Sequence, residues 1–144
     1  MSFSKILLAY DGSPVANKAL EKAVELAGMS ENSVLDVVHV YDFPRVFIGE
    51  GLAPIPPSVN NEVYQLAEQT VEEAKQRLAA AGSSARVELI QGSPVDVIIE
   101  YIKQNDIDLI VIGSRGLSGI REFMLGSVSH RVAQEVSIPV LIVK

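Results

Sequence analysis

The amino-acid sequence predicts an α/β fold with a doubly wound parallel sheet, and two observations indicate it. Four short runs are almost entirely apolar, as in strands that are buried on both faces of a parallel sheet. Between the runs, apolar residues recur every three or four positions, as on one face of an amphipathic helix. Parallel crossovers are right-handed and place helices on both faces of the sheet. We therefore expect residues 1–144 to form a single domain.

Five strands are expected along the chain. The near-continuous apolar runs predict strands at residues 5–10, 34–40, 108–112 and 139–143. A fifth run, residues 86–90, alternates in part between apolar and polar residues, which favours a more exposed, outer strand.

Four helices alternate with these strands. The apolar periodicity predicts them at residues 14–27, 60–81, 94–104 and 127–136. Ser13 and Ser93 each precede a proline, so we expect them to be N-cap residues with proline at the first helical position. Gly28 follows the first helix, and we expect it in the left-handed conformation that often ends a helix.

The segment of residues 41–57 does not fit the short connections of such a fold. It contains four prolines and two glycines, and loops of this length inside a compact domain are often functional or mobile. Two interpretations stay open: a surface loop held by Phe43, Phe47 and Ile48, or a lid over a ligand.

The composition excludes several classes of function. Eighteen acidic and twelve basic residues give a net charge of −6, which disfavours nucleic acid and anionic membranes as partners. The chain has no cysteine, which excludes disulfides, cysteine-ligated zinc and thiol catalysis. Its first apolar run is too short for a signal peptide or a membrane span, so we expect a cytoplasmic protein.

The predicted ligand site lies at the carboxyl ends of the first and fourth strands, because ligands of doubly wound sheets bind where the strand order reverses. After the fourth strand, Gly113 and Gly116 allow the backbone to approach a ligand closely. Gly126 and Ser127 open the last helix, whose N-terminal N–H groups are suited to phosphate. Residues 113–131 also hold three arginines and one glutamate. A glycine-rich turn with an ordinary serine cap is the alternative interpretation.

These residues follow a spaced pattern: Gly113, two residues, Gly116, nine residues, Gly126 and then Ser127. The pattern resembles the signature of the ATP-binding branch of the universal stress protein family. The resemblance covers the whole chain, with Asp-Gly-Ser after the first strand, Val-His-Val in the second and Pro-Val-Leu-Ile-Val in the last. It implies a five-stranded parallel sheet in the order 3-2-1-4-5, with four helices on its two faces.

The resemblance also implies a nucleotide site between the ends of strands one and four and the N-terminus of the last helix. Asp11 would lie near ribose and phosphates, Val40 would contact adenine, and residues 126–129 would form the phosphate cradle. Asp11 could otherwise be a turn residue, and Arg115 a solvated loop charge. The implied nucleotide-binding residues are Ala9, Tyr10, Asp11, Val40, Ile112, Gly113, Arg115, Gly116, Gly126, Ser127, Val128 and Ser129.

No catalytic and no metal-binding residues are predicted. His39 and His130 lie far apart in the chain, and no Gly-x-Ser-x-Gly motif accompanies them, so we interpret them as core or surface residues. Because no cluster of His, Asp and Glu has the spacing of metal ligands, Mg²⁺ would arrive with the nucleotide.

The last predicted strand suggests an oligomer. Val140, Leu141, Ile142 and Val143 form an uncharged apolar strand that would lie at the edge of the sheet, where it needs to be covered or paired. The resemblance implies a homodimer through this strand, with each edge paired to its twin.

The expected function is that of a regulatory stress-response protein that binds ATP, ADP or AMP. Fast hydrolysis is not expected, because the chain has no Gly-Lys pair of the kind that clamps phosphates. Two alternatives stay open. One is a slow ATPase or autophosphorylating enzyme with an adenine-nucleotide hydrolase-like fold. The other is an interaction module that binds no nucleotide and contacts its partner through residues 41–57.

Overall fold

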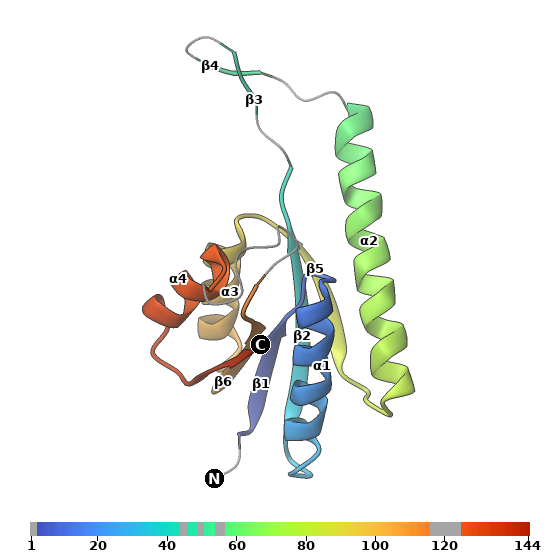
Figure 1. The fold of residues 1–144 in the computed structure, drawn as a ribbon, viewed down its shortest axis with the longest axis vertical. Helices are drawn as coiled ribbons and strands as arrows, with labels where there is room; N and C mark the ends of the chain where they lie inside the picture. The colour runs from blue at the N-terminus through green and yellow to red at the C-terminus, as the bar shows by residue number, and fades with distance from the viewer. Residues whose placement is uncertain (1–2, 44–45, 49–50, 54–56, 116–124) are drawn as a thin grey trace.

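The central feature of the computed structural model is a five-stranded parallel sheet (Figure 1). The structure describes residues 3–43, 46–48, 51–53, 57–115 and 125–144. The sheet has the order β5-β2-β1-β6-β7, which is the expected order 3-2-1-4-5 when its five strands are numbered along the chain. Its strands are β1 (Lys5–Ala9), β2 (Val34–Tyr41), β5 (Arg86–Gln91), β6 (Leu109–Gly113) and β7 (Val140–Val143).

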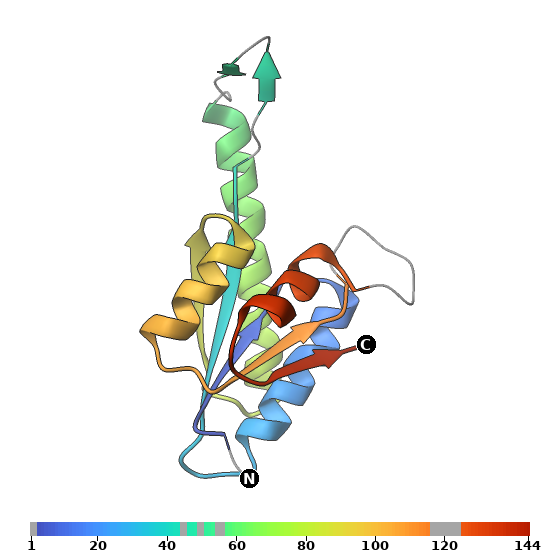
Figure 2. The same ribbon diagram turned by 90° about the vertical axis from the view of Figure 1, so that its left-hand side faces the viewer.

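Helices cover both faces of this sheet. They are α1 (Pro14–Ala27), α2 (Pro57–Ala80), α3 (Pro94–Gln104) and α4 (Ser127–Glu135). Helices α1 and α2 lie on one face and α3 and α4 on the other (Figures 1 and 2). No helix in the described ranges is long and apolar enough to cross a membrane.

The two faces of the inner strands explain their continuous apolar character. In β1, Ile6 and Leu8 pack in the core beneath α1 and α2, whereas Leu7 packs in the core beneath α3 and α4. Burial of each such side chain stabilises the fold by about 1.5–3 kcal/mol. Strand β5 has no residue buried as deeply as these, in agreement with its predicted outer position.

The two predicted N-cap residues are confirmed, whereas the conformation predicted for the C-terminal residue Gly28 is not. Ser13 caps α1, and its hydroxyl oxygen accepts a hydrogen bond from the Ala16 N–H at 3.1 Å. Ser93 is the N-cap of α3, but its side chain makes no capping bond. The left-handed conformation expected for Gly28 is wrong: its φ is −72° and its ψ is −12°. The Gly28 N–H still donates to the Val24 carbonyl, so the helical conformation persists through this residue.

Residues 41–57 contain two short strands that the sequence analysis did not predict. Strand β3 (Val46–Ile48) pairs with β4 (Gly51–Ala53) in an antiparallel ladder. The pair projects away from the sheet beside the N-terminal end of α2 (Figure 1). Helix α2 also begins three residues earlier than expected, at Pro57 rather than residue 60. The buried residues of α2 are Ala67, Val71, Ala74 and Leu78, so its C-terminal part is the part that packs on the sheet.

An aromatic cluster lies at the base of this projection. The Tyr41 ring meets the Phe43 ring edge-on at 5.5 Å between centroids and the Tyr64 ring at 5.8 Å. Phe43 therefore packs on Tyr41, at the end of β2. The side chains of Phe47 and Ile48, which the sequence analysis also expected to hold this segment, lie outside the described part of the structure.

Candidate functional site

A pocket of about 230 Å³ opens at the carboxyl ends of β1, β2 and β6. Strands β1 and β6 are neighbours at the centre of the sheet. From β1 the chain adds β2 and β5 on one side, and from β6 it adds β7 on the other, so the strand order reverses between β1 and β6. The residues that line it are Ala9, Tyr10, Asp11, Ala16, Val38, Val40, Pro94, Ile98, Ile112, Gly113, Arg115, Gly126, Ser127, Val128 and Ser129.

The pocket has an apolar end and a polar end. Strand β2 contributes Val38 and Val40, and Pro94 and Ile98 come from the first turns of α3. Asp11, Arg115 and the first turn of α4 supply the polar groups. Such a mixture suits a ligand with a flat apolar part and a charged part.

A turn between β1 and α1 forms one wall of the pocket. The Asp11 carboxylate accepts a hydrogen bond from the Ser13 N–H at 2.9 Å through Oδ1. Gly12 has a φ of +81°, a conformation that L side chains rarely adopt. Asp11 thus belongs to the turn and also lines the pocket, so the two interpretations of this residue are compatible. Within the described part of the chain, its Oδ2 has no hydrogen-bond partner.

The start of α4 forms another wall of the pocket. Gly126 is the N-cap of α4 and has no side chain to accept hydrogen bonds from the first-turn N–H groups. The Ser129 hydroxyl lies 3.2 Å from the Ser114 carbonyl oxygen and 3.1 Å from that of Gly126, so the two acceptors share its single proton. Ser129 is buried and joins the end of β6 to α4, whereas Ser127 is exposed. An N-terminus of this kind, with its positive end of the helix dipole, is suited to an anion.

A second hollow, at the opposite end of the sheet, is a weaker candidate although it is wider, at about 690 Å³. It lies between the C-terminal ends of α1 and α2 and is lined by Lys5, Arg86 and Asn105, among others. Its cations already have partners: Lys5 Nζ donates to the Asn105 carbonyl, and Arg86 pairs with Asp36. The hollow also lies away from the carboxyl ends of the strands, where ligands of this architecture bind.

Comparison with known proteins places the chain in a family. A model of the universal stress protein family matches residues 2–144. The chain belongs to this family. It is 38% identical to universal stress protein YxiE of Bacillus subtilis, with 99% of each chain covered. Its fold is similar to that of UspA of Lactobacillus plantarum, with a TM-score of 0.77, 24% identity, and 100% and 99% of the two chains covered.

A second solved structure is that of a universal stress protein in complex with cAMP. It is 27% identical to the present chain, with a TM-score of 0.73, and the match covers 100% of this chain and 99% of the other. Nucleotide binding therefore occurs within the universal stress protein family.

The predicted site residues come together in this member of the family. Every predicted site residue that the structure describes lines the same pocket, at the ends of β1, β2 and β6. Gly116 lies outside the described residues. Tyr10 contributes to the pocket wall, although its side chain packs in the core beneath α1 and α2.

Four lining residues are not among those predicted from the sequence: Ala16, Val38, Pro94 and Ile98. A signal was present for some of them. Val38 lies two residues before Val40 and so shares its face of β2. Pro94 follows Gly92 and Ser93 after β5, just as Pro14 follows Gly12 and Ser13 after β1, and both turns lead into helices at the same edge of the sheet. Ile98 lies one helical turn beyond Pro94.

Gly113 has a packing role that the sequence analysis did not consider. A Cβ atom at Gly113 would lie 2.9 Å from Val15 Cγ1 and 3.4 Å from the Val15 carbonyl carbon. The missing side chain at this position therefore lets the first turn of α1 approach the end of β6.

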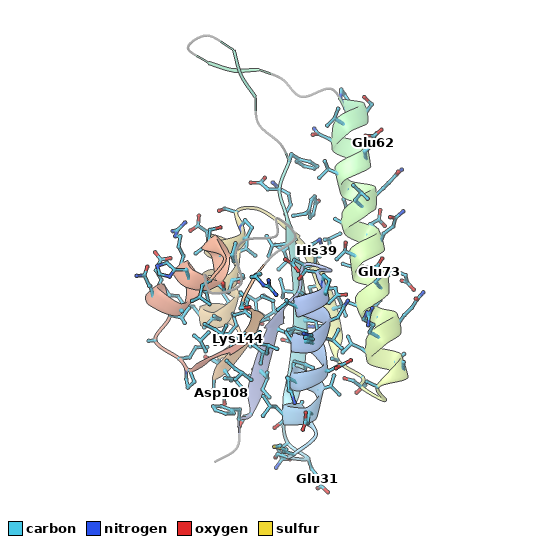
Figure 3. The ribbon with its side chains drawn as sticks, viewed as in Figure 1. Glu31, His39, Glu62, Glu73, Asp108 and Lys144 are labelled. Carbon is cyan, nitrogen blue, oxygen red and sulfur yellow. The ribbon has the colours of Figure 1, made fainter. Side chains whose placement is uncertain are left out.

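The two histidines occupy different environments. The His39 Nδ1 atom lies 2.8 Å from the Tyr10 carbonyl oxygen, on the α1/α2 side of β2 (Figure 3). Burial lowers the pKa of His39, and the bond to Tyr10 and the Asp11 carboxylate partly offset this effect. Burial also raises the pKa of the Tyr10 hydroxyl, which donates to Asn17 Oδ1 at 2.6 Å. His130 is exposed on α4.

Among the described residues, no group of three or more His, Cys, Asp or Glu side chains could hold a metal ion. Asp11 is the carboxylate that lines the pocket. A divalent cation that accompanied a bound phosphate could use its Oδ2 atom.

The lowered pKa of His39 predicts a pH dependence of stability. The ordinary pKa of 6.5 applies to the unfolded chain, whereas burial lowers the value in the folded protein. Between these two pKa values the unfolded chain binds more protons than the folded protein does. The free energy of unfolding therefore falls as the pH drops from 6.5 towards the pKa of His39 in the folded protein. Thermal unfolding of the wild type and of His39→Asn at about pH 7.5 and about pH 5.5 measures this effect. An equal loss of stability in both proteins would contradict the prediction.

Proposed function

We propose that this chain binds an adenine nucleotide in the pocket between the ends of β1 and β6 and the N-terminus of α4, and that the bound nucleotide regulates a stress response in the cytoplasm. One observation carries the proposal. A single pocket combines an apolar compartment with an uncapped helix N-terminus at the reversal point of the strand order. The cAMP complex of a relative that is 27% identical supports it.

Each part of the ligand has a proposed place. The base would lie in the apolar compartment against Val40 and Ile98, which exclude water from its faces. The ribose would lie beside Asp11 and Gly113, between the two walls. The phosphates would meet the first-turn N–H groups of α4 and the Arg115 guanidinium.

The charges favour a nucleotide that arrives with a cation. Asp11 carries a negative charge in the same pocket as the proposed phosphates, and the two repel each other. A Mg²⁺ ion bound to the phosphates would reduce this repulsion and would accept Asp11 Oδ2 as a ligand. We therefore expect ATP and ADP to bind more tightly with Mg²⁺ than without it.

Regulation suits the pocket better than rapid hydrolysis does. No lysine or histidine lines the pocket in the described part of the chain, and Arg115 is its cationic side chain. One carboxylate oxygen of Asp11, the acidic lining residue, is engaged by the Ser13 N–H. Fast phosphoryl transfer usually needs several placed cations and a group that orients the nucleophile.

Ligand release from the purified protein tests the proposal. The freshly purified protein is denatured by heat, and the supernatant is analysed for nucleotides by chromatography. In a second experiment, the refolded or unliganded protein is titrated with ATP, ADP, AMP and cAMP by calorimetry, with and without Mg²⁺. Recovery or saturable binding of an adenine nucleotide would support the proposal. The absence of binding at about millimolar concentration, equivalent to about −4 kcal/mol, would overturn it. Turnover assays on the bound ATP then separate a regulator from a slow ATPase.

We further propose a homodimer through β7. The two edges of the sheet differ in their chemistry. The outer strand β5 carries Arg86 and Glu88, which discourage pairing with another strand, whereas β7 consists of apolar residues. In β7, Leu141 leaves 37% of its surface exposed. Antiparallel pairing of two copies of β7 would satisfy its free backbone groups and cover these side chains.

The variant Leu141→Lys is expected to weaken this dimer. Two copies of the strand would bring two like charges together near the symmetry axis, and each would lose its apolar contact. Light scattering after size-exclusion chromatography, over a range of protein concentrations, measures the mass. Leu141→Ala is the matched control, because it shortens the side chain without adding charge. A dimer of unchanged stability in Leu141→Lys would rule out this interface.

A further inference from the structure

We propose that His39 is a positioning residue of the nucleotide site, which acts by holding the carbonyl group of Tyr10 and with it the turn that carries Asp11. The inference rests on the proposed function of the pocket. It concerns a residue that does not line the pocket itself.

The ladder between β1 and β2 ends at Tyr10. Strand β1 ends at Ala9, and the Tyr10 N–H still donates to the Val38 carbonyl at 2.9 Å. At the Tyr10 carbonyl, the side chain of His39 replaces a backbone donor: its Nδ1 lies 2.8 Å from the oxygen. Within the described residues, no backbone N–H donates to this carbonyl. A side chain therefore extends the pairing of the two strands by one hydrogen bond.

The acceptor determines the direction of the hydrogen bond between His39 and Tyr10. A carbonyl oxygen can only accept, so the proton lies on Nδ1 of the imidazole. Burial lowers the pKa of His39, which favours the neutral ring at neutral pH. The neutral ring then has its N–H at Nδ1 and its lone pair at Nε2.

The Tyr10 carbonyl is connected to the pocket through the turn that carries Asp11. The Tyr10 carbonyl belongs to the same rigid peptide group as the Asp11 N–H, so a fixed carbonyl also fixes the direction in which the chain enters the turn. Asp11 then accepts from the Ser13 N–H, and the Ser13 hydroxyl accepts from the Ala16 N–H. Three hydrogen bonds, connected through the backbone of residues 10–13, thus link His39 to the first turn of α1.

Tyr10 is also held through its side chain. Its hydroxyl donates to Asn17 Oδ1 at 2.6 Å, and its side chain is only 2% exposed. With its N–H, carbonyl and hydroxyl groups all bonded, Tyr10 is a fixed anchor for the turn. His39 lies on the α1/α2 side of the sheet (Figure 3). The pocket residues Val38 and Val40 belong to the core on the α3/α4 side.

Two substitutions separate the donor from the bulk of the side chain. In His39→Leu the Tyr10 carbonyl loses its donor, and ATP affinity is expected to fall about five- to tenfold, because the turn must be ordered when the ligand binds. In His39→Asn, an amide N–H can occupy the place of Nδ1, and the affinity is expected to stay within about twofold of the wild type. Calorimetric titration with Mg²⁺-ATP measures both.

The outcomes are distinguishable from failure of the proposed function. If the wild type itself binds no adenine nucleotide, the proposed function fails. If the wild type binds and folded His39→Leu binds equally well, or if His39→Asn binds as weakly as His39→Leu, the inference about His39 is overturned.

A second measurement uses the unaltered protein and does not depend on whether His39→Leu folds. Nitrogen-15 NMR of the wild type reports which imidazole nitrogen of His39 carries the proton, before and after addition of Mg²⁺-ATP. A proton on Nδ1 in both states is the expected result. A proton on Nε2 alone would overturn the inference, because the Tyr10 carbonyl would then have no donor.

Discussion

The variant Ser127→Glu is expected to weaken the binding of ATP by about one hundredfold, which corresponds to about 2.8 kcal/mol. Ser127 is the first residue of α4 and lines the pocket where the proposed phosphates meet the helix N-terminus. A carboxylate there competes with the phosphates for the same N–H groups and repels them. The repulsion between two like unit charges about 4 Å apart near a protein surface is about 4 kcal/mol, which is larger than the expected loss of binding free energy.

The same variant is expected to keep the fold. Ser127 is exposed, and its side chain makes no hydrogen bond within the described part of the chain. A negative charge in the first turn of a helix interacts favourably with the helix dipole, by about 0.3–1 kcal/mol. Thermal unfolding of Ser127→Glu should therefore occur at or slightly above the temperature of the wild type. Stability and affinity would change in opposite directions, which a general loss of structure cannot produce.

Two controls make the experiment specific. Ser127→Gln has the same shape as Ser127→Glu without the charge, and we expect it to bind ATP at least tenfold more tightly than Ser127→Glu does, or about 1.4 kcal/mol. Adenosine lacks phosphates, so its affinity should be similar in both variants. The difference for ATP should also shrink as salt is added. If Ser127→Glu binds ATP as the wild type does, the phosphates do not lie at the start of α4.

The order of the sheet was implied by the family resemblance, whereas the apolar runs themselves predicted only that the strands are parallel and buried. Ile6 and Leu8 face one helical layer and Leu7 the other, so β1 had to lie in the interior of the sheet. The position of the site followed from the same order, since it defines where the strands diverge. The spacing of Gly113, Gly126 and Ser127 then identified the residues on one wall.

Other features depended on contacts that a linear pattern does not show. Strands β3 and β4 are only three residues each, too short for an alternating pattern, and they lie in a segment rich in glycine and proline. Ile98 reaches the pocket because α3 packs beside β2. The left-handed conformation of Gly28 was predicted from its residue type alone. In the structure its N–H still donates to the Val24 carbonyl, which keeps the residue in the helical conformation.

His39 illustrates the limit on the functional side. The sequence pattern predicts a core or surface residue inside a strand, and His39 does lie in β2. What the sequence could not show is that β1 ends two residues before Asp11, which leaves the Tyr10 carbonyl for the imidazole. The proposed role of His39 therefore depends on the lengths of two neighbouring strands.

The second large effect is expected for Gly113→Val, which should lower the free energy of unfolding by about 3 kcal/mol and the melting temperature by about 10 °C. A Cβ atom at Gly113 would lie 2.9 Å from Val15 Cγ1, 3.4 Å from the Val15 carbonyl carbon and 3.5 Å from the Ala16 nitrogen. Rotation of the Val15 side chain could relieve the first contact. The other two involve the backbone of α1, so the helix itself would have to move.

Movement of α1 would also affect the pocket. The Ala16 N–H donates to the Ser13 hydroxyl, and Ala16 itself lines the pocket. A shift of the first turn of α1 away from β6 therefore disturbs the turn that carries Asp11. We expect Gly113→Val to weaken ATP binding as well as stability, in contrast to Ser127→Glu, which weakens binding alone.

Smaller substitutions locate the cause. Gly113→Ala should destabilise the protein less than Gly113→Val, and adding Val15→Ala to it should restore part of the loss, because the nearest contact atom is then absent. Gly51→Ala is the matched control, since a Cβ atom there would have no neighbour within 4 Å. Calorimetric unfolding of these four variants and of Val15→Ala alone measures these differences. Additive effects of Gly113→Ala and Val15→Ala would show that the two residues do not oppose each other, and the packing explanation for this glycine would then be wrong.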